Sequence, residues 1–526
     1  MMEIREKTLK GLSIAYMYIP VIIFLGGFVR WYYAMITTLI IIFCLIWYLK
    51  DGMPALGYRK VRNEEYDPDR YMRKESEEYF GDISIHPVML CIAIVVIAGI
   101  CIVLGIGGVF PQAGDWEKHN AVLRDLVERP WPVYYDRYDP CMLTYYLGQY
   151  LLPAIAGKIT DSFEVANIVM AVWSIGGLVI VYLMLLRIAK ADEVWKQTVT
   201  LTVFLFFCGG LSLAQFILKL IYVDRMYSMG SYHWLLVDGI MLQYRSNLIM
   251  IRWVLPQIIV PYMATLLLFE KWKKAEYYVL MLLPSLLFGS FSFASLFFMA
   301  IMIATAALIK RKISIRQIFS PLNILPALSL GTILFLYFLG NLQVEKPISS
   351  SFSWQIYDPG HISVYIVFCL MMFGVYALCV FKENKRNPIF YASVFVLMVL
   401  PWMRMGLCND VVMSGSIPAL FVLMIMVIRL LLNDANSTSL GMRKGIAIVF
   451  LMIGCIYPIC ELNENIRTNT PKIDLACEYR SMENFTDRND KNVTEDLKYN
   501  YYTYDMEGKL FCEYVARTKP RYGLSP

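Results

Sequence analysis

Acidic and imidazole side chains stand close together after one apolar run, in the segment Asp115-Trp116-Glu117-Lys118-His119. The residues that follow predict a helix, which places Asp115 and His119 one turn apart on one face. A carboxylate and an imidazole held in this way can take a proton from a nucleophile. Asp115 and Glu117 can also bind a divalent cation such as Mg²⁺ or Mn²⁺. The structural alternative is a capping aspartate with a tryptophan anchored in lipid headgroups. We take Asp115, Glu117 and His119 as candidate catalytic residues, with Asp115 and Glu117 as candidate metal ligands.

Two arginines, Arg245 and Arg252, lie seven positions apart before another apolar run, and His233 precedes them. On a helix the two guanidinium groups share one face, where their planar forks match the oxygens of a phosphate. The alternative is that each arginine extends separately to the lipid headgroups. We take all three residues as candidate substrate-binding residues.

Three more polar residues stand where a later apolar helix begins: Arg404 and the pair Asn409-Asp410. Such a pair is costly beside lipid unless its hydrogen bonds are satisfied, which favours a function, although a helix cap is the alternative. Tyr145 and Gln149 belong to a tyrosine-rich segment that is too polar to span a membrane comfortably. Tyrosines there suit the membrane interface or a sugar-stacking surface. These five residues complete the candidate substrate-binding set.

The elements that must position these residues are apolar helices. Of the 526 residues 58% are hydrophobic and only 17% are charged, where a soluble domain has about 25% charged residues. A span requires about 20 apolar residues. This length predicts an all-α integral membrane protein with about thirteen spans, near 11–29, 31–49, 88–107, 165–186, 198–218, 253–269, 277–309 (two short helices), 321–340, 362–381, 388–402, 416–428 and 445–460.

Lysine and arginine clusters predict the orientation of these spans. Loops that contain the clusters Lys271–Lys274, Lys310–Lys312 and Lys382–Arg386 alternate with loops that are poorer in basic residues. The positive-inside rule then places the N-terminus in the cytoplasm and the C-terminus outside a plasma membrane. Polar loops lie outside at 108–164, 219–251, 341–361 and 403–415. The chain divides into an N-terminal hairpin and cytoplasmic loop (1–86), a transmembrane catalytic region (87–460) and an outer tail (461–526).

The composition also excludes several classes of protein. The net charge of +6 follows from the orienting lysines and arginines, and without a basic low-complexity stretch we expect no nucleic-acid partner. The twelve cysteines form no CxxC pattern. The predicted span interiors are nearly free of Asp, Glu, Lys, Arg and His, whereas ion-coupled carriers usually hold such groups at mid-membrane. Charges gathered on the outer face favour an enzyme that acts on a lipid-borne substrate.

Four ordered motifs resemble the GT-C class of membrane glycosyltransferases, in particular a bacterial branch of it, over roughly residues 85–430. They are Asp115-Trp116-Glu117, the segments 147–154 and 253–257, and the stretch from Asn409-Asp410 to Ala419. The resemblance implies a sugar donor carried on polyprenyl phosphate and an acidic motif in the first large outer loop. One position departs from the branch: Ser414 stands where an arginine is expected. A phosphate-binding role of that arginine would pass to Arg404, Arg245 or Arg252.

The sequence and the resemblance together predict an inverting glycosyl transfer at the outer face, with Asp115 as the base. The partners are membrane lipids, the lipid-linked donor, and a glycan, lipid or protein acceptor of the cell envelope, as in polysaccharide biosynthesis. A polysaccharide polymerase or ligase is a close variant. The alternatives of another class are a transporter or flippase of lipid-linked glycans and a non-catalytic assembly scaffold. We expect Asp115, Glu117, His119, His233, Arg245, Arg252 and Asp410 to line one cleft.

Overall fold

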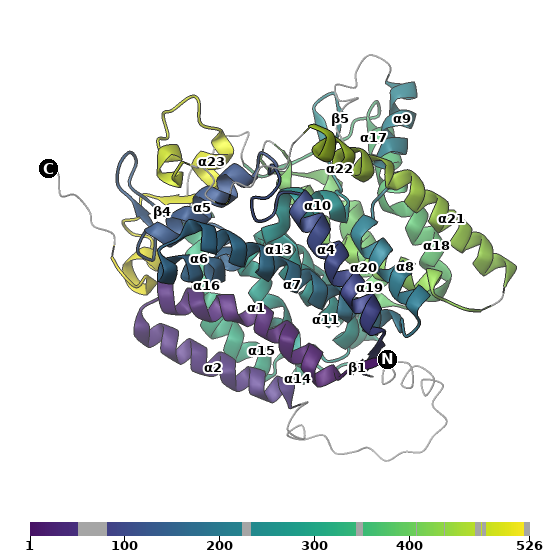
Figure 1. Cartoon of the computed structure of the whole chain (residues 1–526), viewed down its shortest axis with the longest axis horizontal. Coiled ribbons are helices and arrows are strands. Elements are labelled where there is room, and N and C mark those ends of the chain that lie inside the picture. Colours follow the sequence, from purple (N-terminus) through teal and green to yellow (C-terminus); the bar gives the residue numbers. More distant parts are fainter. Residues whose placement is uncertain are drawn as a thin grey trace.

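Long apolar helices form most of the structure, a computed structural model (Figure 1). It describes residues 1–50, 82–222, 233–342, 351–406, 408–435, 437–468, 475 and 480–519. Within these residues eight helices are long and apolar enough to cross a membrane: α1 (Glu6–Phe28), α2 (Trp31–Leu49), α7 (Phe163–Ala189), α13 (Ser290–Ile309), Ile315–Leu342, Ile362–Asn384, α20 (Asp410–Leu431) and Thr438–Arg467. The prediction of an all-α membrane protein is confirmed at this level.

Three of these long helices are built from shorter elements. In Ile315–Leu342 and in Ile362–Asn384, a π-helical turn joins two consecutive α-helices. The elements are α14 (Ile315–Ile318), α15 (Pro321–Pro326) and α16 (Thr332–Leu342); α17 (Ile362–Cys369) and α18 (Val375–Asn384); and α21 (Thr438–Gly454) and α22 (Ile456–Thr468).

The predicted number of about thirteen spans is wrong. Two predicted spans are helix pairs bent at a break, and counting each pair as one span gives at most ten in the described part of the chain. Three others are apolar helices shorter than 18 residues. An apolar run reveals that a segment is buried or faces lipid, but not where its helix bends or ends. The short helices are α4 (Pro87–Val103), Ala275–Leu287, which contains α12 (Tyr278–Leu282), and Pro388–Trp402, which contains α19 (Pro388–Val399).

Both bends have local causes. The pair α8 (Val194–Phe206) and α9 (Leu211–Ile221) bends by 44° at Gly209, where a Cβ would lie 2.5 Å from the carbonyl oxygen of Met372. Only a glycine permits this close backbone approach. The segment Asn247–Gln257, which begins with α10 (Asn247–Val254), meets α11 (Ile259–Lys271) at 102°. Pro261 lies in the first turn of α11, where its missing N–H removes no helical hydrogen bond.

The most deeply enclosed spanning helix is α20. Of its most apolar 18-residue window, 94% is buried inside the protein, and it packs against α11, α13 and α19. Because the helix is apolar on all sides, it needs neighbours around its whole circumference. Asp410 stands at its first position, so the centre of the bundle leads directly to the predicted outer polar loops.

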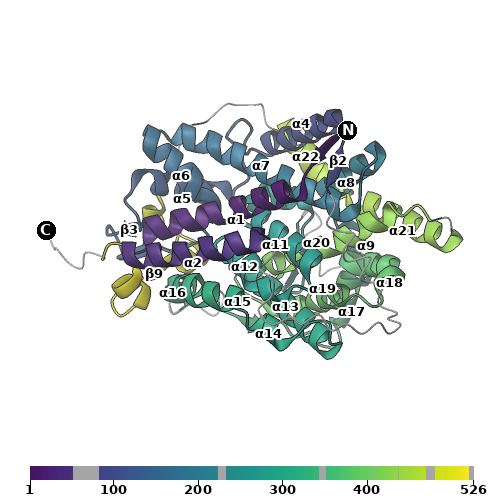
Figure 2. The same cartoon turned by 90° about the horizontal axis from the view of Figure 1, so that it is seen from below.

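Short strands and a helix collect at one edge of the bundle. The three-stranded antiparallel sheet β3 (Tyr134–Tyr135), β4 (Cys141–Leu143), β9 (Tyr502–Tyr504) joins the segment 108–164 to the C-terminal tail, with Met142 opposite Thr503. Figure 1 shows α5 (Trp116–Glu128), β4 and α23 (Glu495–Asn500) along this edge and the N-terminus at the opposite one. Figure 2 shows α1 and α2 side by side along one flank.

Three further two-stranded sheets occur. They are β1 (Met2–Ile4) with β2 (Ile83–Ile85), β5 (Leu235–Val237) with β6 (Ile240–Leu242), and β7 (Ser353–Trp354) with β8 (Met403–Arg404). The turn that joins β5 to β6 is Asp238-Gly239, in which both residues have positive φ (46° and 82°). Asp-Gly favours this tight hairpin turn.

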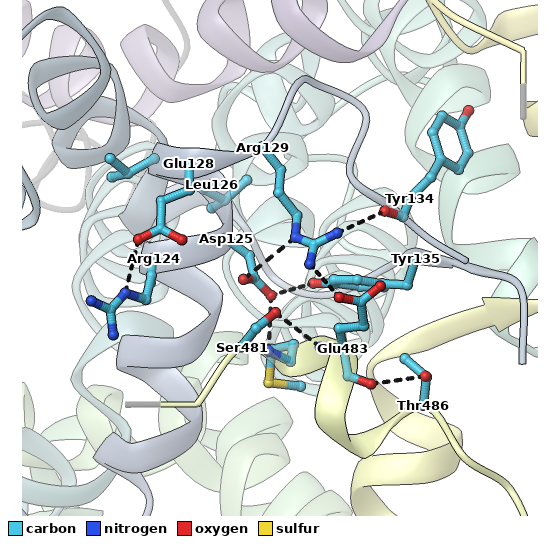
Figure 3. Close-up of polar contacts among 12 residues, drawn as sticks. Arg124, Asp125, Leu126, Glu128, Arg129, Tyr134, Tyr135, Ser481, Glu483 and Thr486 are labelled. Atoms are coloured by element: carbon cyan, nitrogen blue, oxygen red, sulfur yellow. Dashed lines mark hydrogen bonds and ion pairs between the residues drawn. The ribbon is translucent and has the colours of Figure 1, made fainter. Parts of the chain in front are cut away.

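The tail is fastened to the C-terminal end of α5 by charged contacts (Figure 3). The Asp125 carboxylate accepts hydrogen bonds from the Tyr135 hydroxyl at 2.7 Å and the Met482 amide at 2.9 Å. Burial raises the pKa of Asp125, against the opposing effect of these hydrogen bonds. The Arg129 guanidinium donates to Glu483 at 2.5 Å. These contacts hold residues 481–486 beside the helix that carries Asp115 and His119.

Replacing Arg129 with methionine is expected to loosen the tail. The change leaves the carboxylates of Glu483 and Asp125 without their guanidinium partner, and a hydrogen bond to a charged group contributes about 1.5–3 kcal/mol. Limited proteolysis of the solubilised protein measures the effect, as faster cleavage between residues 480 and 519. Arg124→Met is the matched control, because Arg124 pairs with Glu128 on an exposed face of the same helix. Equal cleavage of both variants would contradict the anchoring role.

Candidate functional site

Asp115 lies directly before the first residue of α5, but it does not act as a helix cap. Its carboxylate makes no capping hydrogen bond to the described amides of the helix, and its Oδ1 lies 3.0 Å from the Lys118 Nζ. The side chain is 32% exposed. Burial raises the pKa of Asp115, but Lys118 and other nearby cationic groups outweigh this effect, so the pKa is lowered. Asp115 is therefore a charged carboxylate, partly open to solvent, at neutral pH.

His119, one turn further along α5, is buried and holds three helices together. Its Nε2 lies 3.3 Å from the carbonyl oxygen of Trp253 in α10, and its Nδ1 lies 2.6 Å from the Tyr150 hydroxyl. A carbonyl only accepts, so Nε2 carries the proton and Nδ1 accepts from Tyr150, which lies in α6 (Gly148–Thr160). Burial lowers the pKa of His119 to about 4. The neutral imidazole thus positions α5 instead of facing solvent with Asp115.

Arg252 and Trp253 of α10 connect this helix to both α5 and α22. The Trp116 indole donates to the Arg252 carbonyl oxygen at 2.7 Å, which ties α10 to α5. The Trp253 indole donates to the Glu461 Oε1 at 2.7 Å, which ties α10 to α22.

Glu461 is the buried acid at the centre of this arrangement. Besides the Trp253 indole, its carboxylate lies 3.4 Å from an Arg252 nitrogen and 3.3 Å from the His233 Nδ1. Arg252 also donates to Asn465 at 3.2 Å, one turn further along α22. Burial lowers the pKa of His233 to about 3, and the neighbouring arginines add to this effect. His233 is therefore neutral, and Arg252 provides the positive charge that balances Glu461.

Arg245 lies within the electrostatic reach of three carboxylates, those of Asp115, Asp410 and Glu461. Burial lowers the pKa of Arg245, although the three acids oppose this, and an arginine remains charged in any case. Its Nε donates to Gln243 at 3.0 Å. One terminal nitrogen is buried without a hydrogen-bond partner among the described residues. A buried cation with a remaining donor is suited to bind an anion.

The space beside Arg245 is small in this structure. Arg245, Cys208 and Ser416 border a void of about 10 Å³, which corresponds to about one water molecule. Any substrate group larger than water can therefore bind beside Arg245 only if the surrounding side chains move apart.

The tail contributes an aromatic wall next to these charges. The Tyr145 ring stacks on Tyr501 with ring centres 4.0 Å apart and planes at 17°. Gln257 donates to the Tyr145 hydroxyl at 3.3 Å and accepts from the Ser414 hydroxyl at 3.2 Å. Asp115 and Asp410 both act on Tyr501 electrostatically. Ser414 thus supports the wall through Gln257, and Arg245 provides the nearby positive charge.

Several predicted site residues lie elsewhere. Glu117 is exposed, and Arg404 is an exposed side chain whose guanidinium donates to the Gly239 carbonyl at 3.4 Å. Gln149 is buried among helices, where it donates to Ser174 at 3.0 Å. Asn409 adopts a left-handed conformation (φ 53°) and donates to the Met241 carbonyl at 2.9 Å, so it shapes the turn before α20.

The predicted metal ligands are not neighbours in a ligand cluster. In the ranges that the structure describes, no group of three His, Cys, Asp or Glu side chains could hold a metal ion. Asp115 pairs with Lys118, and Glu117 is exposed to solvent. The structure therefore brings together Asp115, His119, His233, Arg245, Arg252, Asp410 and Tyr145, and it leaves out Glu117, Arg404, Gln149 and Asn409.

Sequence reasoning missed two residues of this site, Glu461 and Tyr501. Both belong to the segment assigned to the outer tail. The spacing of Glu461 and Asn465, four positions apart directly after an apolar run, was the available signal for a polar helix face. Tyr501 stands in the run Tyr501-Tyr502-Thr503-Tyr504, whose aromatic and β-branched residues favour a strand at this position.

We found no family model, curated protein or solved structure that matches this chain. The fold defines an all-α, multi-pass membrane protein. Its site combines a charged, partly open carboxylate with a buried guanidinium and an aromatic wall.

Proposed function

We propose that the protein transfers a sugar from a polyprenyl-phosphate donor to a cell-envelope acceptor at the outer face of the plasma membrane. In the reaction the acceptor hydroxyl gives its proton to Asp115 and its oxygen attacks the anomeric carbon. The bond from that carbon to the phosphate oxygen breaks, and the phosphate leaves with the bonding electrons. Attack from the side opposite the phosphate inverts the configuration of the sugar.

The observation that carries the proposal is a charged, partly exposed carboxylate, Asp115, within electrostatic reach of the buried guanidinium of Arg245. A base must be deprotonated and accessible, and the lowered pKa and partial exposure of Asp115 meet both conditions. The departing phosphate develops negative charge, and Arg245 has a buried donor without a partner among the described residues. The rings of Tyr145 and Tyr501 stack on each other and are buried, so a sugar could contact them only after neighbouring side chains move.

The orientation in the proposal rests on charge. In Figure 1, α5, β4 and α23 lie at the edge opposite the N-terminus. The basic clusters Lys271–Lys274 and Lys382–Arg386 stand at the ends of α11 and α18. With these clusters in the cytoplasm, the N-terminus is cytoplasmic and the site faces outward, where lipid-linked sugars replace nucleotide sugars as donors.

In this proposal a divalent Mg²⁺ or Mn²⁺ ion held by Asp115 and Glu117 would only assist the arginines in stabilising the charge of the leaving phosphate. The arginines supply positive charge without it. A chelator added to the transfer assay distinguishes the two arrangements, because a reaction supported by Arg245 alone continues in its presence.

A transporter or flippase of lipid-linked glycans is the second class to be distinguished. Among the described residues, the buried pair Arg187–Glu270 lies near the ends of α7 and α11 and not at mid-helix, which favours an enzyme over an ion-coupled carrier. The deciding assay uses purified protein, a polyprenyl-phosphate sugar and candidate acceptors. A new glycosidic bond supports the enzyme, including a polymerase or ligase, and lipid movement without a new bond supports the carrier.

Replacing Arg245 with glutamine is expected to weaken donor binding. The loss of a charge-assisted hydrogen bond to phosphate corresponds to a roughly 10- to 100-fold rise in the donor Kd. Binding of the polyprenyl-phosphate sugar to detergent-solubilised protein measures it. Arg404→Gln is the control, since Arg404 is an exposed arginine of β8 that lies outside the site. Equal donor affinity for Arg245→Gln and the unmodified protein would remove Arg245 from the proposed phosphate site.

A further inference from the structure

A large cavity lies at the other end of the bundle from Asp115. Its volume is about 890 Å³, and it is bordered by the C-terminal ends of α11, α18 and α20 and by the start of α19. α20 has 22 residues, which at 1.5 Å each separate its two ends by about 33 Å. Asp410 of the candidate site begins this helix, and Arg429 of the cavity is in its last turn. The cavity is thus separate from the candidate functional site.

The lining of the cavity is strongly cationic. It contains two glutamates, Glu270 and Glu383, against seven basic residues: Lys271, Lys273, Lys274, Lys382, Lys385, Arg386 and Arg429. Arg187, which is outside the lining, pairs with Glu270. Arg443, also outside it, makes two hydrogen bonds to Glu383, at 2.5 and 2.6 Å. Arginines outside the lining thus pair with both of its acids, and the lining itself contains five more basic than acidic residues.

The start of α19 and the buried Lys271 add to this charge. Asn387 caps α19 by accepting a hydrogen bond from the Ile389 amide at 3.0 Å, and Pro388 and Ile389 border the cavity. The positive end of the α19 dipole therefore points to the same space as the lysines. Lys271 is only 3% exposed, so its charge is held inside the protein and not dispersed in solvent.

The remaining lining is apolar, with Phe269, Trp272, Val380, Met426 and Leu430 among its residues. Pockets for small ligands usually have volumes of 300–1,000 Å³, and this cavity falls within that range. Basic pockets between transmembrane helices typically bind the phosphate groups of anionic lipids. The combination suits a ligand that has negative phosphate groups next to an apolar part.

We propose that this cavity binds a phosphate-bearing anion that bridges α11, α18, α19 and α20. Phosphate groups contact the lysines and arginines, and any apolar part of the ligand contacts Trp272 and Leu430. Two sources share this chemistry: the headgroup of an anionic membrane lipid and a soluble polyphosphate. The proposal does not depend on glycosyl transfer at the opposite end.

The test compares two triple variants of the full chain. K382Q/K385Q/R386Q removes three exposed cations of the cavity. K310Q/R311Q/R316Q removes three cations from exposed positions outside the lining, so it is matched in charge. Each delipidated protein is titrated with cardiolipin, with phosphatidylcholine as the uncharged control, and separately with inorganic pyrophosphate at constant ionic strength. Bound ligand is counted by native mass spectrometry, and the unfolding midpoint is followed in parallel.

We expect the unmodified protein and the K310Q/R311Q/R316Q variant to bind the anion and to unfold at a higher temperature in its presence. The cavity variant should bind it about 100-fold more weakly, because each basic residue near an anionic surface contributes about fivefold. Retention of cardiolipin identifies a lipid headgroup, and retention of pyrophosphate alone identifies a soluble ligand. Equal binding by both triple variants, or binding of neither anion by the unmodified protein, would overturn the proposal.

Discussion

Asp115→Asn is expected to lower the rate of glycosyl transfer by about 10² to 10⁴-fold while protein amount and donor binding stay nearly unchanged. This factor is the usual contribution of a general base. Asparagine keeps the shape of the side chain and one of its acceptor atoms, but it cannot take the proton of the acceptor hydroxyl. The loss should therefore fall on kcat and leave the donor Kd alone.

The measurement is single-turnover transfer with saturating donor, and Glu128→Gln is the matched control. It removes a carboxylate from the same helix at a position 56% exposed, where the pair with Arg124 contributes little. Full activity of Asp115→Asn would exclude Asp115 as the base and leave Asp410, which also acts electrostatically on Arg245.

The pH profile gives Asp115 a second, independent test. Burial raises the pKa of Asp115, but Lys118 and the other lowering interactions together outweigh it, so the folded pKa lies below the ordinary value of 3.8. The base form is thus present at neutral and mildly acidic pH and is lost only as pH falls through the lowered pKa. Lys118→Gln removes the first of the lowering interactions, so the acid limb of kcat/KM should move to higher pH. An unmoved limb would mean that another group titrates there.

Glu461→Ala is expected to cause the largest loss of stability among the site variants. The change leaves Arg252, whose side chain is 15% exposed, without its carboxylate and removes the acceptor of the Trp253 indole. Removing one partner of a buried pair costs about 3–5 kcal/mol, and the partial exposure of Arg252 favours the lower end. Thermal unfolding of the solubilised protein measures the change as a lowered midpoint.

Two comparisons separate the lost charge from the lost hydrogen bond. Glu461→Gln keeps an acceptor for Trp253 but removes the charge, so its midpoint should lie between those of Glu461→Ala and the unmodified protein. Glu464→Ala alters an exposed acid on the same helix and should change stability by less than about 0.5 kcal/mol. If Glu461→Ala and Glu464→Ala unfold at the same temperature, Glu461 does not hold α10 to α22.

Hydrophobic runs predicted where the apolar helices lie, and even the break near Gly289 was visible, since Ala275–Leu287 ends there and α13 begins at Ser290. The number of spans could not be predicted in the same way. An average over 20 residues has the same value for a straight helix and for two helices bent by 102°. The bend depends on Pro256 and Pro261 together with the helices they pack against, and only the prolines are readable from the sequence.

The site was partly predictable for a similar reason. Polar residues at the ends of apolar runs drew attention to Asp115, Arg245 and Asp410, and these do converge. The roles of His119 and Glu461 depend on tertiary contacts. His119 has Tyr150 and Trp253 on its two nitrogens. Glu461 reaches its partners Arg252 and Trp253 only because α22 lies beside α10. The spacing of residues within one helix can indicate a polar face, but it does not indicate which other helix that face contacts.

Because the sheet pairs β4 with β9 near the end of the chain, it can form only late in synthesis. Thr144 and Thr503, whose hydroxyls lie 2.7 Å apart, are separated by 359 positions in the chain. At about 5–20 residues per second, ribosomes produce β9 roughly 20–70 s after β4. During that interval the helices can insert, but Tyr145 lacks Tyr501 and α5 lacks the tail that clamps Asp125. The contacts between the tail and α5 therefore form last, after the helices between β4 and β9 have been synthesised.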